Sequence, residues 1–200
     1  MRLCLYGGTF DPIHLGHLVV AETVREACAL DEIWFVVARE PPHKPGERTP
    51  ADHRLEMARI AIAGHPSFDV SEHDIKRPGP HYSADLLEIV GRERPDDELF
   101  FLIGADSLAD LPNWRRPERI LELATVIAVN RLGVEPILPP RLEPMLARPG
   151  SKPILHIETP IIELASRDLR ARVAGGRSIR YLVPRGVEAY IEAQRLYRSR

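Results

Sequence analysis

Short apolar runs alternate along the chain with longer segments whose apolar residues recur at helical spacing. The short runs predict buried strands, because they are too brief for helices and lack the polar alternation of a half-exposed strand. They cover residues 2–6, 33–37, 68–70, 99–103, 125–129 and 154–157. The helical spacing predicts helices over 15–29, 52–63, 83–92 and 117–123, with two further short helices near Asp168 and Val187.

Strands that alternate with helices predict an α/β fold with a doubly wound parallel sheet. At 200 residues the chain is expected to form a single domain over 1–200, with a C-terminal helical segment from about residue 165. Asp52 is a candidate N-cap for its helix and Gly64 a candidate stop. Proline-rich residues 39–50 predict a loop, and residues 131–152 predict an irregular surface excursion.

Charge and hydropathy exclude several classes of protein. The formal net charge is −2, which gives no general attraction to nucleic acid or to an anionic membrane. No apolar run approaches the ~18 residues of a membrane helix, and the apolar N-terminal run is too short for a secretory signal. We therefore expect a soluble, cytoplasmic protein with no membrane partner. Cys4 and Cys28 form no C-x-x-C pair and are expected to be buried, reduced thiols.

Residues 165–200 contain nine arginines against three acidic residues. Three tyrosines lie among them, but they follow no recognisable base-stacking motif, and the rest of the chain offsets the charge. We interpret this segment as a solvated basic face and expect no nucleic-acid partner.

The chemistry is concentrated where the first strand meets the first helix. Gly7 and Gly8 allow the backbone to approach a ligand closely, and the helix that follows directs the positive end of its dipole at the same place. His14 and His17 share a face of the first helical turn, so both can donate hydrogen bonds to phosphate oxygens. Gly16 between them is expected to leave room for a bulky ligand. A simple tight turn, a helix cap, or a metal site with Asp11 as a third ligand remain alternatives.

The string from Gly7 to His17, G-G-T-F-D-P-I-H-L-G-H, resembles the G-[TS]-F-D-P-x-H-x-G-H signature of the HxGH nucleotidylyltransferases. The resemblance implies a Rossmann-like fold and an enzyme that binds ATP with Gly7, Gly8, Thr9, Phe10, His14 and His17.

Further segments resemble one branch of that superfamily, the bacterial nicotinate-nucleotide adenylyltransferases. Residues 41–44 are similar to its P-P-H-K loop, in which Lys44 would reach phosphates across the site. Residues 77–86 are similar to its R-x-G-x-S-Y-T-x-D-T-L stretch, which implies that Tyr82 and Ser83 recognise nicotinate mononucleotide. His81, Ser83 and Leu86 depart from that pattern, standing where the branch has Ser, Thr and Thr. Residues 111–114 match its L-P-x-W segment, so the indole of Trp114 would stack on the pyridinium ring.

Two later segments complete the resemblance. Gly104 and Asp106 match the family's G-A-D turn, where they would meet the ATP ribose. Ser166 and Arg170 match an S-S-[TSR]-x-[IL]-R motif that holds the outgoing phosphates, although Ala165 replaces the first serine. Residues 178–184 resemble the family's closing segment.

The implied reaction is nicotinate mononucleotide adenylyl transfer in NAD biosynthesis, giving deamido-NAD and pyrophosphate. No motif places a Ser or Cys nucleophile beside a base, so the attacking group belongs to the substrate. His14, His17, Lys44 and Arg170 are the implied catalytic residues, and Thr9 and Lys44 join Tyr82, Ser83 and Trp114 in binding the mononucleotide. Mg²⁺ is expected to arrive with ATP, without a dedicated protein metal site.

Three alternatives differ from this interpretation. The acceptor could instead be pantetheine phosphate, glycerol phosphate or nicotinamide mononucleotide. The chain could be a catalytically silent nucleotide sensor, although the two histidines, Lys44 and Arg170 are all present. A dehydrogenase is disfavoured because the G-x-G-x-x-G spacing is missing. The sequence leaves open whether the chain forms a homodimer.

Overall fold

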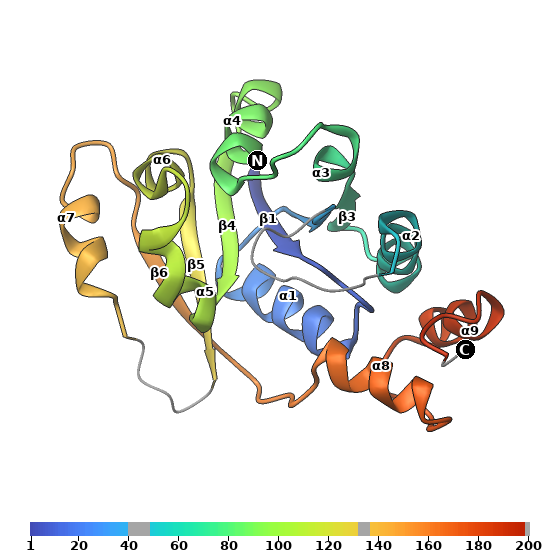
Figure 1. The fold of residues 1–200 in the computed structure, drawn as a ribbon. Coiled ribbons are helices and arrows are strands. Elements are labelled where there is room, and N and C mark those ends of the chain that lie inside the picture. Colours follow the sequence, from blue (N-terminus) through green and yellow to red (C-terminus); the bar gives the residue numbers. More distant parts are fainter. Residues whose placement is uncertain (40–48, 132–136, 199–200) are drawn as a thin grey trace.

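A six-stranded parallel sheet organises the fold in the computed structural model, which describes residues 1–39, 49–131 and 137–198 (Figure 1). The strand order is β3-β2-β1-β4-β5-β6, and every neighbouring pair is parallel. The strands are β1 (Arg2–Gly8), β2 (Glu32–Val37), β3 (Phe68–Ser71), β4 (Glu98–Gly104), β5 (Thr125–Arg131) and β6 (Ile154–Thr159). The six predicted strands and the doubly wound α/β class are confirmed.

The strand order reverses between β1 and β4, which lie side by side at the centre of the sheet. In doubly wound sheets the connections leave in opposite directions at this point, so a crevice opens beyond the carboxyl ends of the two strands. β1 ends at Gly8 and β4 at Gly104. Two of the predicted ligand-binding turns therefore meet at one edge of the sheet.

Helices cover both faces of the sheet. In Figure 1, α8 and α9 lie beside α1 and α2, on the opposite side of the molecule from α6 and α7. The α-helices are α1 (Leu15–Ala27), α2 (Ala51–Ile62), α3 (His73–Lys76), α4 (Ser83–Glu93), α5 (Ala105–Asp110), α6 (Pro117–Leu123), α7 (Glu143–Leu146), α8 (Ser166–Ala174) and α9 (Arg185–Ala193), with short 3₁₀ turns at Leu111–Asn113 and Pro140–Leu142.

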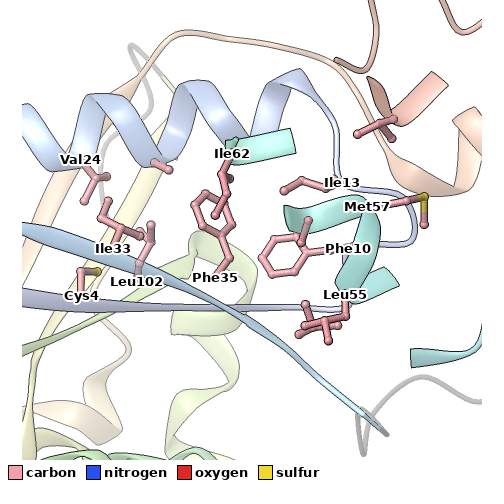
Figure 2. Close-up of a cluster of buried hydrophobic side chains, with 14 of the residues drawn as sticks. Cys4, Phe10, Ile13, Val24, Ile33, Phe35, Leu55, Met57, Ile62 and Leu102 are labelled. Carbon is pink, nitrogen blue, oxygen red and sulfur yellow. The ribbon is translucent and has the colours of Figure 1, made fainter. Parts of the chain in front are cut away.

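Successive residues of each central strand enter different cores, because side chains alternate across a strand. Cys4 of β1 packs in the core beneath α1 and α2, whereas Leu3 and Leu5 pack in the core beneath α4 and α6. Figure 2 shows the first core, in which Phe35 of β2 and Leu102 of β4 pack with residues of α1 and α2. Apolar burial on both faces explains why the strands are continuous apolar runs.

Two local predictions need correction, and two short helices were missed. Asp52 is not the N-cap of α2: the helix begins at Ala51 and Pro50 occupies the cap, which leaves Asp52 in the first turn. Residues 137–152 are not merely an irregular excursion, since they form a 3₁₀ turn and α7, and Leu142 is fully buried. The short helices α3 and α5 were also not predicted, because four and six residues give too little periodicity to detect. Gly64 does follow the end of α2 with a φ of +86°, as expected of a helix stop.

Within the described ranges, no helix has the length and apolar content that crossing a bilayer requires. Cys4 and Cys28 are buried and free, as predicted. Burial raises the pKa of both thiols above the ordinary range, so neither is a reactive thiolate.

Candidate active site

A cavity of about 1040 Å³ lies beyond the carboxyl ends of β1 and β4, at the point where the strand order reverses. It is large enough for a nucleotide-sized ligand. Eight of the predicted site residues line it: Gly7, Gly8, Thr9, Tyr82, Ser83, Gly104, Asp106 and Trp114. The structure thus brings together residues from three segments that are far apart in the sequence.

The turn after β1 is anchored in the core by its own apolar residues. Phe10 and Ile13 are buried, and Figure 2 shows them beside Leu55 and Met57 of α2. The Phe10 ring also explains Gly8, because a Cβ at residue 8 would lie 2.6 Å from a carbon of that ring. Phe10 does not line the cavity. Its backbone is part of the turn, and its buried side chain packs in the core and supports the turn.

His14 and His17 stack on one another at the first turn of α1. Their ring centroids are 3.7 Å apart, with 26° between the ring planes. The His14 backbone N–H donates to Nδ1 of His17 over 3.2 Å. Because Nδ1 accepts this bond, the neutral form of the His17 ring carries its proton on Nε2. The ring edge also packs against Phe10 at a centroid distance of 5.1 Å, which fixes its orientation.

His14 is deeply buried, with 5% of its surface exposed. Burial lowers the pKa of His14 to about 4, so the ring is neutral at pH 7. The ring also occupies the space above Gly16, where an added Cβ would lie 3.1 Å from two His14 atoms. The expectation that Gly16 leaves room for a ligand is therefore wrong: the glycine makes room for the His14 ring.

The beginning of α8 lies against the loop that follows the Gly7–Gly8 turn. The Ser166 hydroxyl donates to the carbonyl oxygen of Pro12 over 2.9 Å, and Nη1 of Arg170 donates to that of Asp11 over 2.7 Å. Segments more than 150 residues apart in the sequence are thus joined directly. These contacts put Ser166 and Arg170 next to the loop that leads into His14.

The Asp11 carboxylate is buried and committed to structure. Its Oδ1 accepts the hydroxyl of Tyr197 over 2.7 Å, and its Oδ2 accepts the backbone N–H of Thr49 over 3.4 Å. Burial and the neighbouring carboxylate raise the pKa of Tyr197 well above its ordinary range, so the phenol stays a donor. Asp11 therefore ties the C-terminal segment to the site.

Arg54 of α2 is a buried guanidinium with 1% of its surface exposed, directly behind the site. It donates to four backbone carbonyls. Nη1 reaches those of Thr9 and Ala38 over 2.8 and 2.7 Å; Nε reaches that of Thr49 over 2.9 Å and Nη2 that of Arg39 over 3.1 Å. It thus links the turn after β1, the end of β2 and the segment just before α2.

Two aromatic side chains, Tyr82 and Trp114, form part of the cavity wall. The indole Nε1 of Trp114 donates to Asp110 over 3.2 Å, and the ring meets Phe101 edge-on. The guanidinium carbon of Arg115 lies 4.7 Å from the centre of the Tyr82 ring. Both Trp114 and Tyr82 line the cavity, which suits a flat, cationic ring such as a pyridinium.

Gly104 ends β4 and Asp106 lies in the first turn of α5, and both residues line the cavity and are exposed. A Cβ at Gly104 would meet no atom within 4 Å, so the space above this glycine is open. Asn130 of β5 and Asp74 of α3 are buried polar residues that also line the cavity. Asp74 accepts two hydrogen bonds from Arg77, which leaves Asn130 as an additional candidate for nucleotide binding.

The predicted site residues thus form two groups around the turn after β1. One group lines the cavity, and the other, formed by His14, His17, Ser166 and Arg170, lies along the loop and the start of α1. Lys44 falls outside the described residues. The ligand contacts of both groups remain predictions.

In the parts of the chain that the structure describes, no three His, Cys, Asp or Glu side chains gather to hold a metal ion. The alternative of a metal site on His14, His17 and Asp11 gains no support, since Asp11 is occupied by Tyr197 and Thr49.

Sequence reasoning missed Arg54 and Arg115. The sequence pattern did indicate that Arg54 is buried, because it lies on the same face of α2 as the apolar residues Ala58 and Ile62, four and eight residues later. A charge on an apolar stripe indicates a buried polar network. Arg115 carried no such signal, since it follows Trp114 in a polar stretch typical of surface.

The chain is similar to known proteins over nearly its whole length. The sequence model of the cytidylyltransferase-like family matches residues 5–184. A Thermomicrobium roseum protein named a probable nicotinate-nucleotide adenylyltransferase is 47% identical over 201 residues, covering 99% of this chain and 92% of the relative. A Thermus thermophilus protein with the same name is 44% identical, covering 99% of this chain and all of the relative.

A solved structure from Plasmodium falciparum, a nicotinic acid mononucleotide adenylyltransferase complexed with NaAD, superposes with a TM-score of 0.77. It covers 98% of this chain and 97% of its own at 22% identity, which establishes the shared fold. The family model and the full-length matches place this chain in the nicotinate-nucleotide adenylyltransferase branch of the cytidylyltransferase-like family, and the fold agrees.

Proposed function

We propose that the chain transfers AMP from ATP to the 5′-phosphate of nicotinate mononucleotide, giving deamido-NAD and pyrophosphate. The observation that carries the proposal is that the glycine turn at the end of β1 lines the same cavity as Tyr82 and Trp114. The turn suits phosphates and the aromatic wall suits a pyridinium ring. Full-length relatives with this name support the same activity.

The chemistry asks the protein to position two substrates and to stabilise charge. An oxygen of the mononucleotide 5′-phosphate forms a bond to the α-phosphorus of ATP, while the bond from that phosphorus to the bridging oxygen of the β-phosphate breaks. Negative charge grows on the leaving pyrophosphate. The imidazole of His17 would donate to the nucleotide phosphates through Nε2–H, and the remaining N–H groups of Arg170 are candidates for the leaving group.

The other residues have complementary proposed roles. Backbone N–H groups of Gly8, Thr9 and Phe10 would hold the acceptor and α-phosphates. Gly104 and Asp106 would hold the ATP ribose, because an exposed carboxylate accepts hydrogen bonds from two hydroxyls. Lys44 would bind on the acceptor side.

Mg²⁺ would be held by ATP phosphate oxygens and water rather than by side chains. Mg²⁺ prefers oxygen ligands, whereas the imidazoles and the guanidinium near the start of α1 offer only nitrogen. The carboxylate of Asp11 already accepts hydrogen bonds from Tyr197 and Thr49. The bound ion would neutralise part of the charge on the leaving pyrophosphate.

The test is pyrophosphate release from the pure protein with Mg-ATP and one mononucleotide at a time. We expect turnover with nicotinate mononucleotide and a lower kcat/KM with nicotinamide mononucleotide, pantetheine phosphate and glycerol phosphate. His17→Ala should lower kcat by about 10²–10³-fold, the typical cost of one preorganised donor.

The control is His65→Ala, because His65 contacts Glu22 and Phe68 and does not line the cavity. It should keep the parental kcat. Parental turnover in His17→Ala would contradict the assigned site, and a preference for another acceptor would contradict the assigned substrate.

A further inference from the structure

We propose that the side chain of Arg115 selects nicotinate over nicotinamide mononucleotide by pairing with the ring carboxylate. This inference rests on the proposed function and concerns the one group by which the two mononucleotides differ. That group is a carboxylate in the acid and a neutral carboxamide in the amide.

Arg115 is placed for this role by its neighbours. It follows Trp114 directly, lines the same cavity, and holds its guanidinium 4.7 Å from the centre of the Tyr82 ring. Tyr82 and Trp114 form the wall proposed to bind the pyridinium ring. The long side chain of Arg115 can therefore reach a substituent of that ring.

The neighbouring arginines already form ion pairs with carboxylates. Arg116 pairs with Asp85 and Glu88 of α4, and Arg119 pairs with Glu88 and Glu122. By contrast, no carboxylate among the described residues lies within ion-pair distance of Arg115, whose guanidinium lies over the face of the Tyr82 ring. Its fork of N–H donors is available to a ligand carboxylate.

The other charged residues that line the cavity are acidic. Asp74, Asp106 and Asp110 all line it, and Arg115 is the one Lys or Arg among the described lining residues. Asp74 is already paired with Arg77. In the absence of Arg115, the exposed carboxylate of Asp106 would still repel the nicotinate carboxylate and favour the neutral amide. Arg115 reverses that preference at the end of the cavity where the ring is expected.

The experiment compares kcat/KM for the two mononucleotides at saturating Mg-ATP in the parental chain, Arg115→Gln, Arg115→Lys and Arg119→Gln. A charge-assisted hydrogen bond contributes roughly 10- to 100-fold, and the exposure of Arg115 places the effect near tenfold. Arg115→Gln should therefore lower the acid-to-amide ratio of kcat/KM about tenfold. The loss should appear in KM for the acid, because the carboxylate is remote from the reacting phosphorus.

Arg115→Lys should retain part of the ratio, since it keeps the charge and loses the fork. Arg119→Gln removes the same charge outside the cavity and should leave the ratio within about twofold of the parent. KM for ATP should not change in any variant.

Two outcomes would overturn the inference alone. The first is an unchanged acid-to-amide ratio in Arg115→Gln while the parental enzyme turns over the acid, and the second is an equal loss for both mononucleotides. A parental chain that releases no pyrophosphate with either mononucleotide would instead refute the proposed function, and the inference with it.

Discussion

Arg54 gives the sharpest test of how the site is held in shape. We consider its replacement by methionine, which keeps a long unbranched side chain in the same space but removes every donor. Four carbonyl oxygens, those of Thr9, Ala38, Arg39 and Thr49, would lose a partner in a region from which water is excluded.

The magnitude follows from those four bonds. At about 1 kcal/mol of net stabilisation each, their loss lowers the free energy of unfolding by about 4 kcal/mol, within the range of about 3–5 kcal/mol for removing one side of a buried charged network. For a chain of 200 residues this corresponds to a fall in Tm of roughly 6–20 °C. Turnover should fall as well, by up to about 10²-fold, because the turn that carries Thr9 is no longer fixed.

Urea unfolding followed by circular dichroism measures the change, with Arg59→Met as the matched control. Arg59 lies on the same helix but is 46% exposed and pairs with Glu56 and Glu72 at the surface, so its loss should cost at most about 1 kcal/mol. If Arg54→Met and Arg59→Met unfold at the same urea concentration, the four carbonyl bonds do not stabilise the fold and the reasoning is refuted.

Two further predictions concern the turn after β1. Because burial lowers the pKa of His14 from 6.5 to about 4, the unfolded chain binds more protons than the folded chain between these values. The contribution of the neutral His14 ring to the free energy of unfolding is therefore complete above pH 6.5 and falls by about 3 kcal/mol as the pH drops to 4. Urea titrations at several pH values should show this loss. In His14→Gln, the part of the pH dependence that comes from His14 should disappear. Gly8→Ala places a Cβ 2.6 Å from the buried Phe10 ring, so it should destabilise the chain by about 1–3 kcal/mol, whereas Gly104→Ala, which meets no atom within 4 Å, should leave the unfolding midpoint unchanged. Equal midpoints for the two alanine variants would show that Phe10 does not constrain residue 8.

The resemblance of residues 7–17 to a nucleotidylyltransferase signature identified the turn after β1, and the fold agrees with its predicted position. Sequence alone misjudged Gly16, however. Spacing along a helix shows which residues share a face, but only packing shows that the His14 ring fills the space above the glycine. A residue's small size was interpreted as room for a ligand when it was room for a neighbour.

The partners of Ser166 and Arg170 illustrate a second limit. Their motif was visible in the sequence, whereas their contacts with the carbonyls of Pro12 and Asp11 bridge more than 150 residues. No local pattern encodes which distant backbone groups a side chain will meet.

The alternation of apolar runs and helical spacing determined, by itself, a doubly wound parallel sheet whose glycine turns follow strands. Hydrophobic periodicity acts locally, so it is fully written in the order of residues. Only the tertiary structure decided that Arg54 is buried among four carbonyls, that His14 is a neutral, buried ring, and that Arg115 lies in the cavity beside Tyr82. The physical reason is that solvation and pairing of a polar group depend on everything that packs around it, and those neighbours come from segments that meet only when the chain has folded.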